Sequence, residues 1–129
     1  MTKQPITTAI LSYGMSGEMF HAPLIAAHPD FELSTIVQRK SAHAVTRYPK
    51  TKIVTSIETV LADPAIELVI VNTPNDTHFD FAFKALHAGK HVVMEKPFTV
   101  TASEADQLIT LAKQKNRVLT VFQNRRWDG

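Results

Sequence analysis

The sequence predicts an α/β fold: a doubly wound, mainly parallel sheet of six strands with helices on both faces, in a single domain. Hydrophobic runs alternate with amphipathic helical patterns along the whole chain, which is typical of parallel strands joined by crossover helices. The runs I-E-L-V-I-V-N and H-V-V-M-E are short, apolar and β-branched, as expected for central strands covered on both faces. The length of 129 residues, of which 44% are hydrophobic, suffices for one domain with its own core.

The individual elements follow from the spacing of apolar side chains. Short apolar runs predict strands, and apolar side chains three or four positions apart predict helices. The expected strands are about 6–12, 32–37, 52–54, 66–72, 91–95 and 117–123. The expected helices are about 16–28, 41–47, 56–62, 77–88 and 101–115. The sequence contains no internal repeat, low-complexity tract or interdomain linker.

Specific residues mark the ends of the last two helices. Asp76 is placed to cap the helix over 77–88, and Gly89 stands where a C-terminal cap belongs. Thr101 opens the capping-box pattern T-A-S-E at the start of the helix over 101–115. The alternation F-D-F-A-F within the first of these helices resembles a strand pattern, but the caps and the length favour a helix.

The composition excludes several classes of protein. The chain contains no cysteine, which excludes disulfides, thiolate zinc sites and a cysteine nucleophile. Its first residues lack the apolar core of a signal peptide, and no run approaches the roughly 20 apolar residues of a membrane span. We therefore expect a cytoplasmic protein that does not contact a membrane.

The six histidines do not predict a metal site. His87 and His91 are four positions apart, but Gly89 breaks the helix between them, and no group of carboxylates accompanies any histidine pair. We expect no bound metal. Three histidines are expected to be surface or helix-packing residues: His21, His28 and His43.

The net charge of +2 is too small to indicate nucleic-acid binding. The segment 39–52 nevertheless contains five basic residues and no acidic one, and Tyr48 is its only Phe, Tyr or Trp side chain. The basic residues are Arg39, Lys40, Arg47, Lys50 and Lys52. We expect no nucleic-acid partner, and two interpretations of the segment remain: a solvated face, or a local site for an anionic ligand.

In an open parallel sheet, ligands bind beyond the carboxyl ends of the strands, near the point where the strand order reverses. The loop after the first strand reads S-Y-G-M-S-G, so that Gly14 and Gly17 fill the second and third positions of the dinucleotide-binding pattern G-x-G-x-x-G. The absence of a Cβ at Gly14 lets the backbone approach a pyrophosphate, and Ser16 can add a hydroxyl donor. Ser12 replaces the first glycine, so we expect a tight turn with ordinary dihedral angles. An ordinary turn between a strand and a helix is the alternative.

The loop after the second strand reads V-Q-R-K-S. An NAD-specific domain carries an acidic residue here for the ribose 2′-hydroxyl, but Glu32 lies at the opposite, amino end of the strand. Arg39 and Lys40 stand instead where a 2′-phosphate would lie, which favours NADP. A basic turn in water is the alternative interpretation.

The fourth and fifth strands end in N-T-P-N-D-T-H and M-E-K-P-F. Lys96, in the second of these segments, is expected at the ligand-facing end of a central strand whose surroundings are otherwise apolar. Its ammonium group could orient or polarise a hydroxyl or carbonyl oxygen beside a nicotinamide ring.

Together these loops make the chain similar to the N-terminal Rossmann domain of the glucose-fructose oxidoreductase, inositol dehydrogenase and MocA family of NAD(P)-dependent oxidoreductases. The resemblance rests on four segments in the family's order and spacing, which together span nearly the whole chain. They are Y-G-M-S-G-E-M-F-H-A-P-L-I, T-P-N-D-T-H, A-G-K-H-V-V-M-E-K-P-F and Q-N-R-R-W-D.

The resemblance implies a cofactor site for NADP, with NAD possible, and a catalytic role for Lys96, whose peptide bond to Pro97 is typically cis in the family. Typical members pass hydride between nicotinamide C4 and a secondary alcohol or ketone of a sugar, polyol or similar compound. The implied cofactor contacts are Gly14, Met15, Ser16 and Gly17 at the pyrophosphate, Arg39 and Lys40 at the adenosine ribose, and Thr73, Pro74, Asn75, His78, Glu95, Lys96, Asn124 and Arg125 toward the nicotinamide.

Family members continue into a second α/β domain that supplies the substrate pocket, a catalytic histidine and usually an oligomer interface. We therefore expect residues 1–129 to be a cofactor-binding domain that lacks turnover by itself. The full-length protein would act on a small-molecule substrate as a homo-oligomer. The alternative is a stand-alone NAD(P)-binding or redox-sensing module without catalysis.

Overall fold

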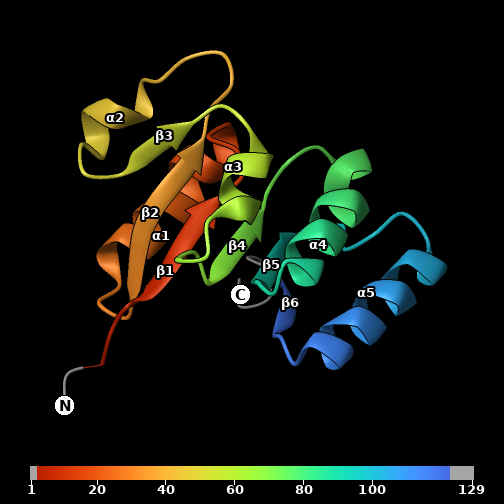
Figure 1. The fold of residues 1–129 in the computed structure, drawn as a ribbon. Coiled ribbons are helices and arrows are strands. Elements are labelled where there is room, and N and C mark those ends of the chain that lie inside the picture. The colour runs from red at the N-terminus through yellow and green to blue at the C-terminus, as the bar shows by residue number, and fades with distance from the viewer. Residues whose placement is uncertain (1–2, 123–129) are drawn as a thin grey trace, which may run out of the picture.

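A computed structural model describes residues 3–122. Within this range, six parallel strands form one sheet in the order β3-β2-β1-β4-β5-β6 (Figure 1). The strands are β1 (Ile6–Ile10), β2 (Phe31–Val37), β3 (Lys52–Val54), β4 (Leu68–Val71), β5 (His91–Glu95) and β6 (Leu119–Phe122). The predicted doubly wound fold is confirmed, and in the described residues the sheet is parallel throughout.

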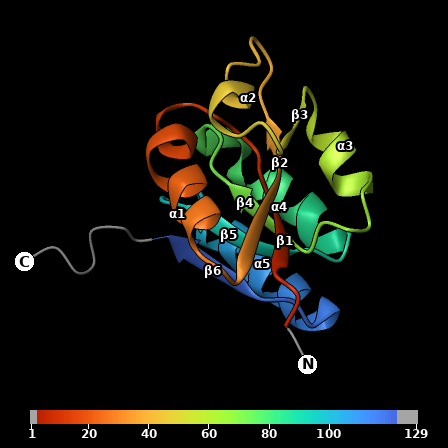
Figure 2. The same cartoon turned by 90° about the vertical axis from the view of Figure 1, so that its left-hand side faces the viewer.

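The helices cover both faces of the sheet. They are the π-helical turn η1 (Gly17–His21), α1 (Ala22–Ala27), α2 (Ala44–Arg47), α3 (Ile57–Ala62), the 3-10 turn η2 (Asn75–Thr77), α4 (His78–His87) and α5 (Ala102–Lys115). Helices α1 and α2 pack on one face, and α3, α4 and α5 pack on the other, with the sheet between them (Figure 2). This three-layer arrangement leaves the carboxyl ends of the strands free to carry a site.

Strand β4 shows why the apolar runs form buried strands. Its side chains alternate between the two cores: Val69 and Val71 pack under α3 and α4, whereas Ile70 packs toward α1. All three are buried, and each contributes about 1.5–3 kcal/mol relative to an exposed position. A strand with apolar side chains on both faces is stable only between two helical layers, which is the reason for the doubly wound topology.

Several predicted boundaries differ from the structure. The strands expected over 6–12 and 66–72 end at Ile10 and Val71, because the chain turns out of the sheet to begin the two loops described below. The helix expected over 16–28 consists of two helix types, a π-helical turn followed by α1. The last strand ends at Phe122, and residue 123 lies outside the described residues.

The helix caps agree with the sequence in two of three cases. Gly89 has φ +85° after α4, and Thr101 Oγ1 accepts a hydrogen bond from the Glu104 N–H at 3.2 Å, as predicted. Asp76 does not cap α4, and that prediction was wrong. It lies inside the turn η2, and Thr77 precedes the helix without a side-chain cap. The turn that follows Pro74 delays the start of the helix by one residue, so Thr77 rather than Asp76 occupies the N-cap position.

Lys90 is a buried cation at the amino end of β5. Its Nζ donates hydrogen bonds to the backbone carbonyls of Asp63, at 2.5 Å, and Ile66, at 2.9 Å. Burial lowers the pKa of Lys90 below its ordinary value, because desolvation penalises the charged form. The two carbonyls come from the segment between α3 and β4, so Lys90 joins that segment to β5.

We predict that Lys90→Met lowers the free energy of unfolding by about 1–3 kcal/mol, because it keeps most of the aliphatic stem but removes the ammonium donor from the Ile66 carbonyl and leaves the Asp63 carbonyl with only the Ile66 N–H. Urea unfolding of the chain measures the change. The matched control is Lys84→Met, since Lys84 is exposed and forms only an i,i+4 ion pair with Asp80. Equal unfolding midpoints for the Lys90 variant and the wild type would contradict the prediction.

Candidate nucleotide-binding site

The strand order reverses between β1 and β4, and the loops that follow these two strands lie against each other. The chain runs outward from β1 to β3 and then crosses back to β4. Beyond the strands, the Leu11 N–H donates to the Ile70 carbonyl at 3.2 Å, and Asn72 Nδ2 donates to the Ser12 carbonyl at 2.8 Å. In folds of this kind the reversal point is where ligands bind.

The loop after β1 turns tightly without the first glycine of the pattern. The described residues contain only two positive φ angles, at Gly89 and Asn116, so Ser12 turns with ordinary dihedral angles, as predicted. The Ser12 hydroxyl accepts a hydrogen bond from the Gly14 N–H at 3.3 Å. The serine therefore replaces the conformational freedom of a glycine with a side-chain contact inside the turn.

The two remaining glycines have different reasons to be glycine. A Cβ at Gly17 would lie 2.1 Å from the Ser12 carbonyl oxygen and 3.0 Å from Asn72 Nδ2, so no side chain fits there. A Cβ at Gly14 would meet only the Ser12 hydroxyl, at 3.6 Å, which is ordinary contact. Gly17 is thus required by the folded loop, whereas Gly14 leaves its exposed backbone open to a ligand.

The backbone after Gly14 presents a group of free donors. In the part of the chain that the structure describes, the N–H groups of Met15, Ser16 and Gly17 donate to no protein atom. Consecutive free amides at the start of a helical segment attract an anion, since they carry partial positive charge and need an acceptor. The loop therefore fits a phosphate or pyrophosphate group.

The loop after β2 is held by a polar network beneath its basic residues. Gln38 is buried; its Oε1 accepts from the Ala44 N–H at 3.1 Å and its Nε2 contacts His43 Nδ1 at 2.9 Å. Arg39 and Lys40 follow directly, are exposed, and form no ion pair within residues 3–122. Two exposed cations thus follow β2 at its carboxyl end.

Tyr13 connects the first two loops. It is buried, and its ring lies 5.3 Å from the His43 ring and 6.4 Å from the Tyr48 ring, centroid to centroid. Burial is the main cause that raises the pKa of Tyr13 above its ordinary value. The phenol stays neutral, so it serves as a packing group between the loops.

The loop after β4 presents Pro74 and Asn75 to solvent, with Thr73 partly buried. The Thr77 hydroxyl contacts Thr73 Oγ1 and the Pro74 carbonyl, both at 2.6 Å, which holds the turn. His78 is only 1% exposed. Its ring nitrogens face the Pro97 carbonyl at 2.7 Å and the Thr73 carbonyl at 2.9 Å, so the ring joins the loops after β4 and β5.

The loop after β5 begins with Lys96, which is exposed. The Lys96–Pro97 peptide bond is cis, as the family resemblance implied. Glu95, at the end of the strand, contacts His21 Nε2 through Oε1 at 2.5 Å, and the Phe122 ring lies 4.7 Å from the His21 ring. The buried His21, the last residue of η1, therefore connects η1 to the end of β5.

Sequence reasoning did not find Gln38, Asn72 or the contact between His21 and Glu95. The last joins residues 74 positions apart, and no local spacing signals such a pair. Gln38 and Asn72 lie within the segments V-Q-R-K-S and N-T-P-N-D-T-H but were not predicted as site residues, and a polar residue directly after a buried strand was the available signal. Asn124 and Arg125 lie outside the described residues.

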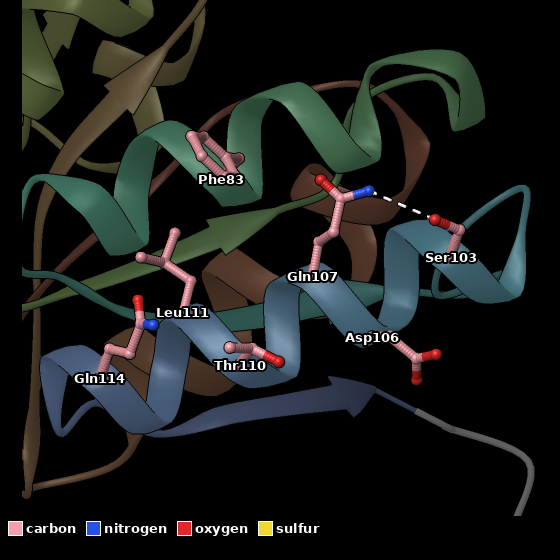
Figure 3. A pocket seen from close by; sticks show the side chains of 7 residues that line it. All are labelled: Phe83, Ser103, Asp106, Gln107, Thr110, Leu111 and Gln114. Atoms are coloured by element: carbon pink, nitrogen blue, oxygen red, sulfur yellow. Dashed lines mark hydrogen bonds between the residues drawn. The ribbon is translucent and has the colours of Figure 1, made fainter.

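Other kinds of site find no support in residues 3–122. No group of three histidine, cysteine, aspartate or glutamate residues there has the arrangement of a metal site. None of the described helices is long and apolar enough to cross a membrane. A groove between α4 and α5 is lined by seven residues, none of them predicted as a cofactor contact (Figure 3). They are Phe83, Ser103, Asp106, Gln107, Thr110, Leu111 and Gln114.

A parallel sheet with this strand order, with free amides in the loop at its reversal point, has the architecture of a dinucleotide-binding Rossmann domain. Comparison with family models agrees: residues 6–123 match the model of the GFO_IDH_MocA oxidoreductase family, described as an NAD-binding Rossmann fold. The chain belongs to this family.

Curated relatives are similar along nearly the whole chain. The oxidoreductase YdgJ of Escherichia coli K12 is 47% identical over 124 residues, which cover 96% of this chain and 36% of the relative. The scyllo-inositol 2-dehydrogenase (NADP(+)) IolW of Bacillus subtilis is 42% identical over 96% of this chain and 35% of the relative. The chain thus spans about a third of the length of these relatives.

Solved structures show the same fold. An oxidoreductase from Bacteroides fragilis matches with a TM-score of 0.95 and 50% identity over 97% of this chain and 39% of that one. The biliverdin reductase of Synechocystis, solved with biliverdin and NADP+, matches with a TM-score of 0.81 and 27% identity over 92% of this chain and 38% of that one.

Proposed function

We propose that this chain binds NADP(H) and is the cofactor-binding part of an enzyme that transfers hydride to or from a secondary alcohol or ketone of a sugar, polyol or similar compound. The observation that carries the proposal is the group of free amides at Met15, Ser16 and Gly17, beside exposed Arg39 and Lys40. The family match supports the class of cofactor. The names of IolW and of the Synechocystis reductase structure associate NADP with two similar proteins.

The residues present fit the cofactor at each of its parts. The free amides suit the pyrophosphate, and the absent Cβ of Gly14 leaves room for it. The guanidinium of Arg39 suits a 2′-phosphate, because its fork can make two parallel hydrogen bonds to phosphate oxygens. The exposed residues Pro74 and Asn75 border the same edge and would contact the nicotinamide half.

When bound, the nicotinamide ring supplies the hydride donor or acceptor at its C4 atom. The chain's own groups would bind the cofactor, orient the nicotinamide ring and polarise the substrate oxygen. Lys96 carries an ammonium group just after the carboxyl end of β5 and would hold the substrate oxygen. A positioned acid or base of this kind contributes about 10²–10⁴-fold to the rate. His78 contacts the carbonyls of Thr73 and Pro97 and would hold the loops that contain these two residues against each other.

The assignment of Arg39 to the 2′-phosphate predicts that the chain binds NADPH more tightly than NADH. Arg39→Ala should weaken NADPH binding by about tenfold or more, because a hydrogen bond between charged groups contributes about 1.5–3 kcal/mol, and should leave NADH binding nearly unchanged. Nucleotide fluorescence measures both affinities. Lys50→Ala, at the amino end of β3, is the matched loss of one exposed positive charge. Tighter binding of NADH than of NADPH by the wild type would remove Arg39 from this role.

A further inference from the structure

Asn72 lies directly after β4 and beneath the phosphate-binding loop. It is only 7% exposed. Its Nδ2 donates to the Ser12 carbonyl at 2.8 Å and contacts Ser16 Oγ at 3.4 Å. It also limits the space at Gly17, where a Cβ would lie 3.0 Å from Nδ2. One side chain thus contacts the beginning, the middle and the helical end of the loop.

The chemistry of the partners determines which way the amide faces. A backbone carbonyl can only accept a hydrogen bond, so the NH₂ group of Asn72 must face Ser12. Its Oδ1 is buried without a partner among the described residues. An unpaired buried acceptor costs about 1–3 kcal/mol, so this side chain is not the choice that stability alone would favour. The cost is consistent with a role for its donors.

The same orientation determines the direction of the Ser16 hydroxyl. The NH₂ group has two hydrogens: one is directed to the Ser12 carbonyl, and the other is available to Ser16 Oγ. When Ser16 Oγ accepts this hydrogen bond, its own hydrogen is not needed inside the protein. That hydrogen can then point to the side of the loop where the amides of Met15 and Gly17 have no protein acceptor.

We propose that Asn72 is a positioning residue of the nucleotide site: it holds the Ser12 carbonyl in the turn and sets Ser16 as a hydrogen-bond donor to the pyrophosphate. This inference rests on the proposed function, because it requires a phosphate at the loop. It also explains how the turn keeps its shape where Ser12 replaces a glycine.

A double-mutant cycle tests the coupling between Asn72 and Ser16. NADPH affinity is measured for the wild-type chain, Asn72→Ala, Ser16→Ala and the double variant, with circular dichroism to verify folding. Each single change should weaken binding by about five- to tenfold, and the double change by much less than the product of the two. The proposal would be overturned if the affinity losses of the two single variants multiply in the double variant. It would also be overturned if the Asn72→Ala chain binds NADPH as tightly as the wild type.

Two further measurements keep the test decisive. Asn72→Asp has the same shape but only accepts hydrogen bonds, so it should repel the Ser12 carbonyl, draw the Ser16 hydrogen inward and weaken NADPH binding by at least about tenfold. In the wild-type chain, the side-chain NH₂ resonances of Asn72 should shift when NADPH is added, which requires no variant. Unchanged resonances with saturating NADPH would refute the role of Asn72. A wild-type chain that binds neither NADPH nor NADH would instead refute the proposed function.

Discussion

Gly17→Ala is expected to lower the free energy of unfolding by about 3 kcal/mol or more. The added Cβ would lie 2.1 Å from the Ser12 carbonyl oxygen, which is backbone and cannot rotate away as a side chain would. The first loop and the π-helical turn would have to separate, and overpacking that forces a backbone shift is among the costliest effects of one substitution. Urea unfolding measures the loss.

Gly14→Ala is the matched control for this prediction. Its Cβ would meet only the Ser12 hydroxyl, at 3.6 Å, so stability should change by no more than about 0.5 kcal/mol. Binding of NADPH should nevertheless weaken strongly, because the methyl group occupies the space through which the backbone meets the pyrophosphate. Equal unfolding midpoints for the two variants would contradict the distinction between a glycine needed by the fold and one needed by the ligand.

Lys96→Ala in the full-length protein is expected to lower turnover by about 10²–10⁴-fold, the usual contribution of a positioned acid or base. The affinity for NADPH should change by only about threefold, since Lys96 is assigned to the substrate oxygen rather than to the phosphates. Steady-state kinetics and a nucleotide titration separate the two effects.

The exposed Lys84 on α4 provides the control for the loss of a lysine, and Lys84→Ala should leave turnover unchanged. Lys96 is also exposed and forms no ion pair in the described part of the chain, so its removal should not destabilise the fold. Normal turnover of the Lys96 variant would exclude it from the mechanism.

The fold could be predicted from the sequence because its signals are local. A run such as L-V-I-V is stable only as a strand covered on both faces, and alternation with helical patterns then implies the parallel topology. The errors lie at the ends of elements. Asp76 has the residue type of a helix cap, but the turn that follows Pro74 places it one position before the N-cap residue, Thr77. Such a competition between two local preferences is decided by the surrounding structure.

The candidate site was predictable where a motif carries it and not where distant residues meet. The motifs around Gly14 and Lys96 follow strands whose carboxyl ends must share one edge of the sheet. Asn72 opens the segment N-T-P-N-D-T-H, but it was not predicted as a site residue, because its partners, Ser12 and Ser16, lie 60 and 56 positions away. No spacing in the sequence indicates such contacts, since they depend on how β1 and β4 are placed side by side.

The most direct test of the dinucleotide site is a titration of the chain with NADPH, followed by amide NMR. We expect saturable binding, with the largest shifts at the free amides of Met15, Ser16 and Gly17 and further shifts around Arg39. Absence of binding, or shifts confined to the groove between α4 and α5, would contradict the assignment of this edge of the sheet as a dinucleotide site.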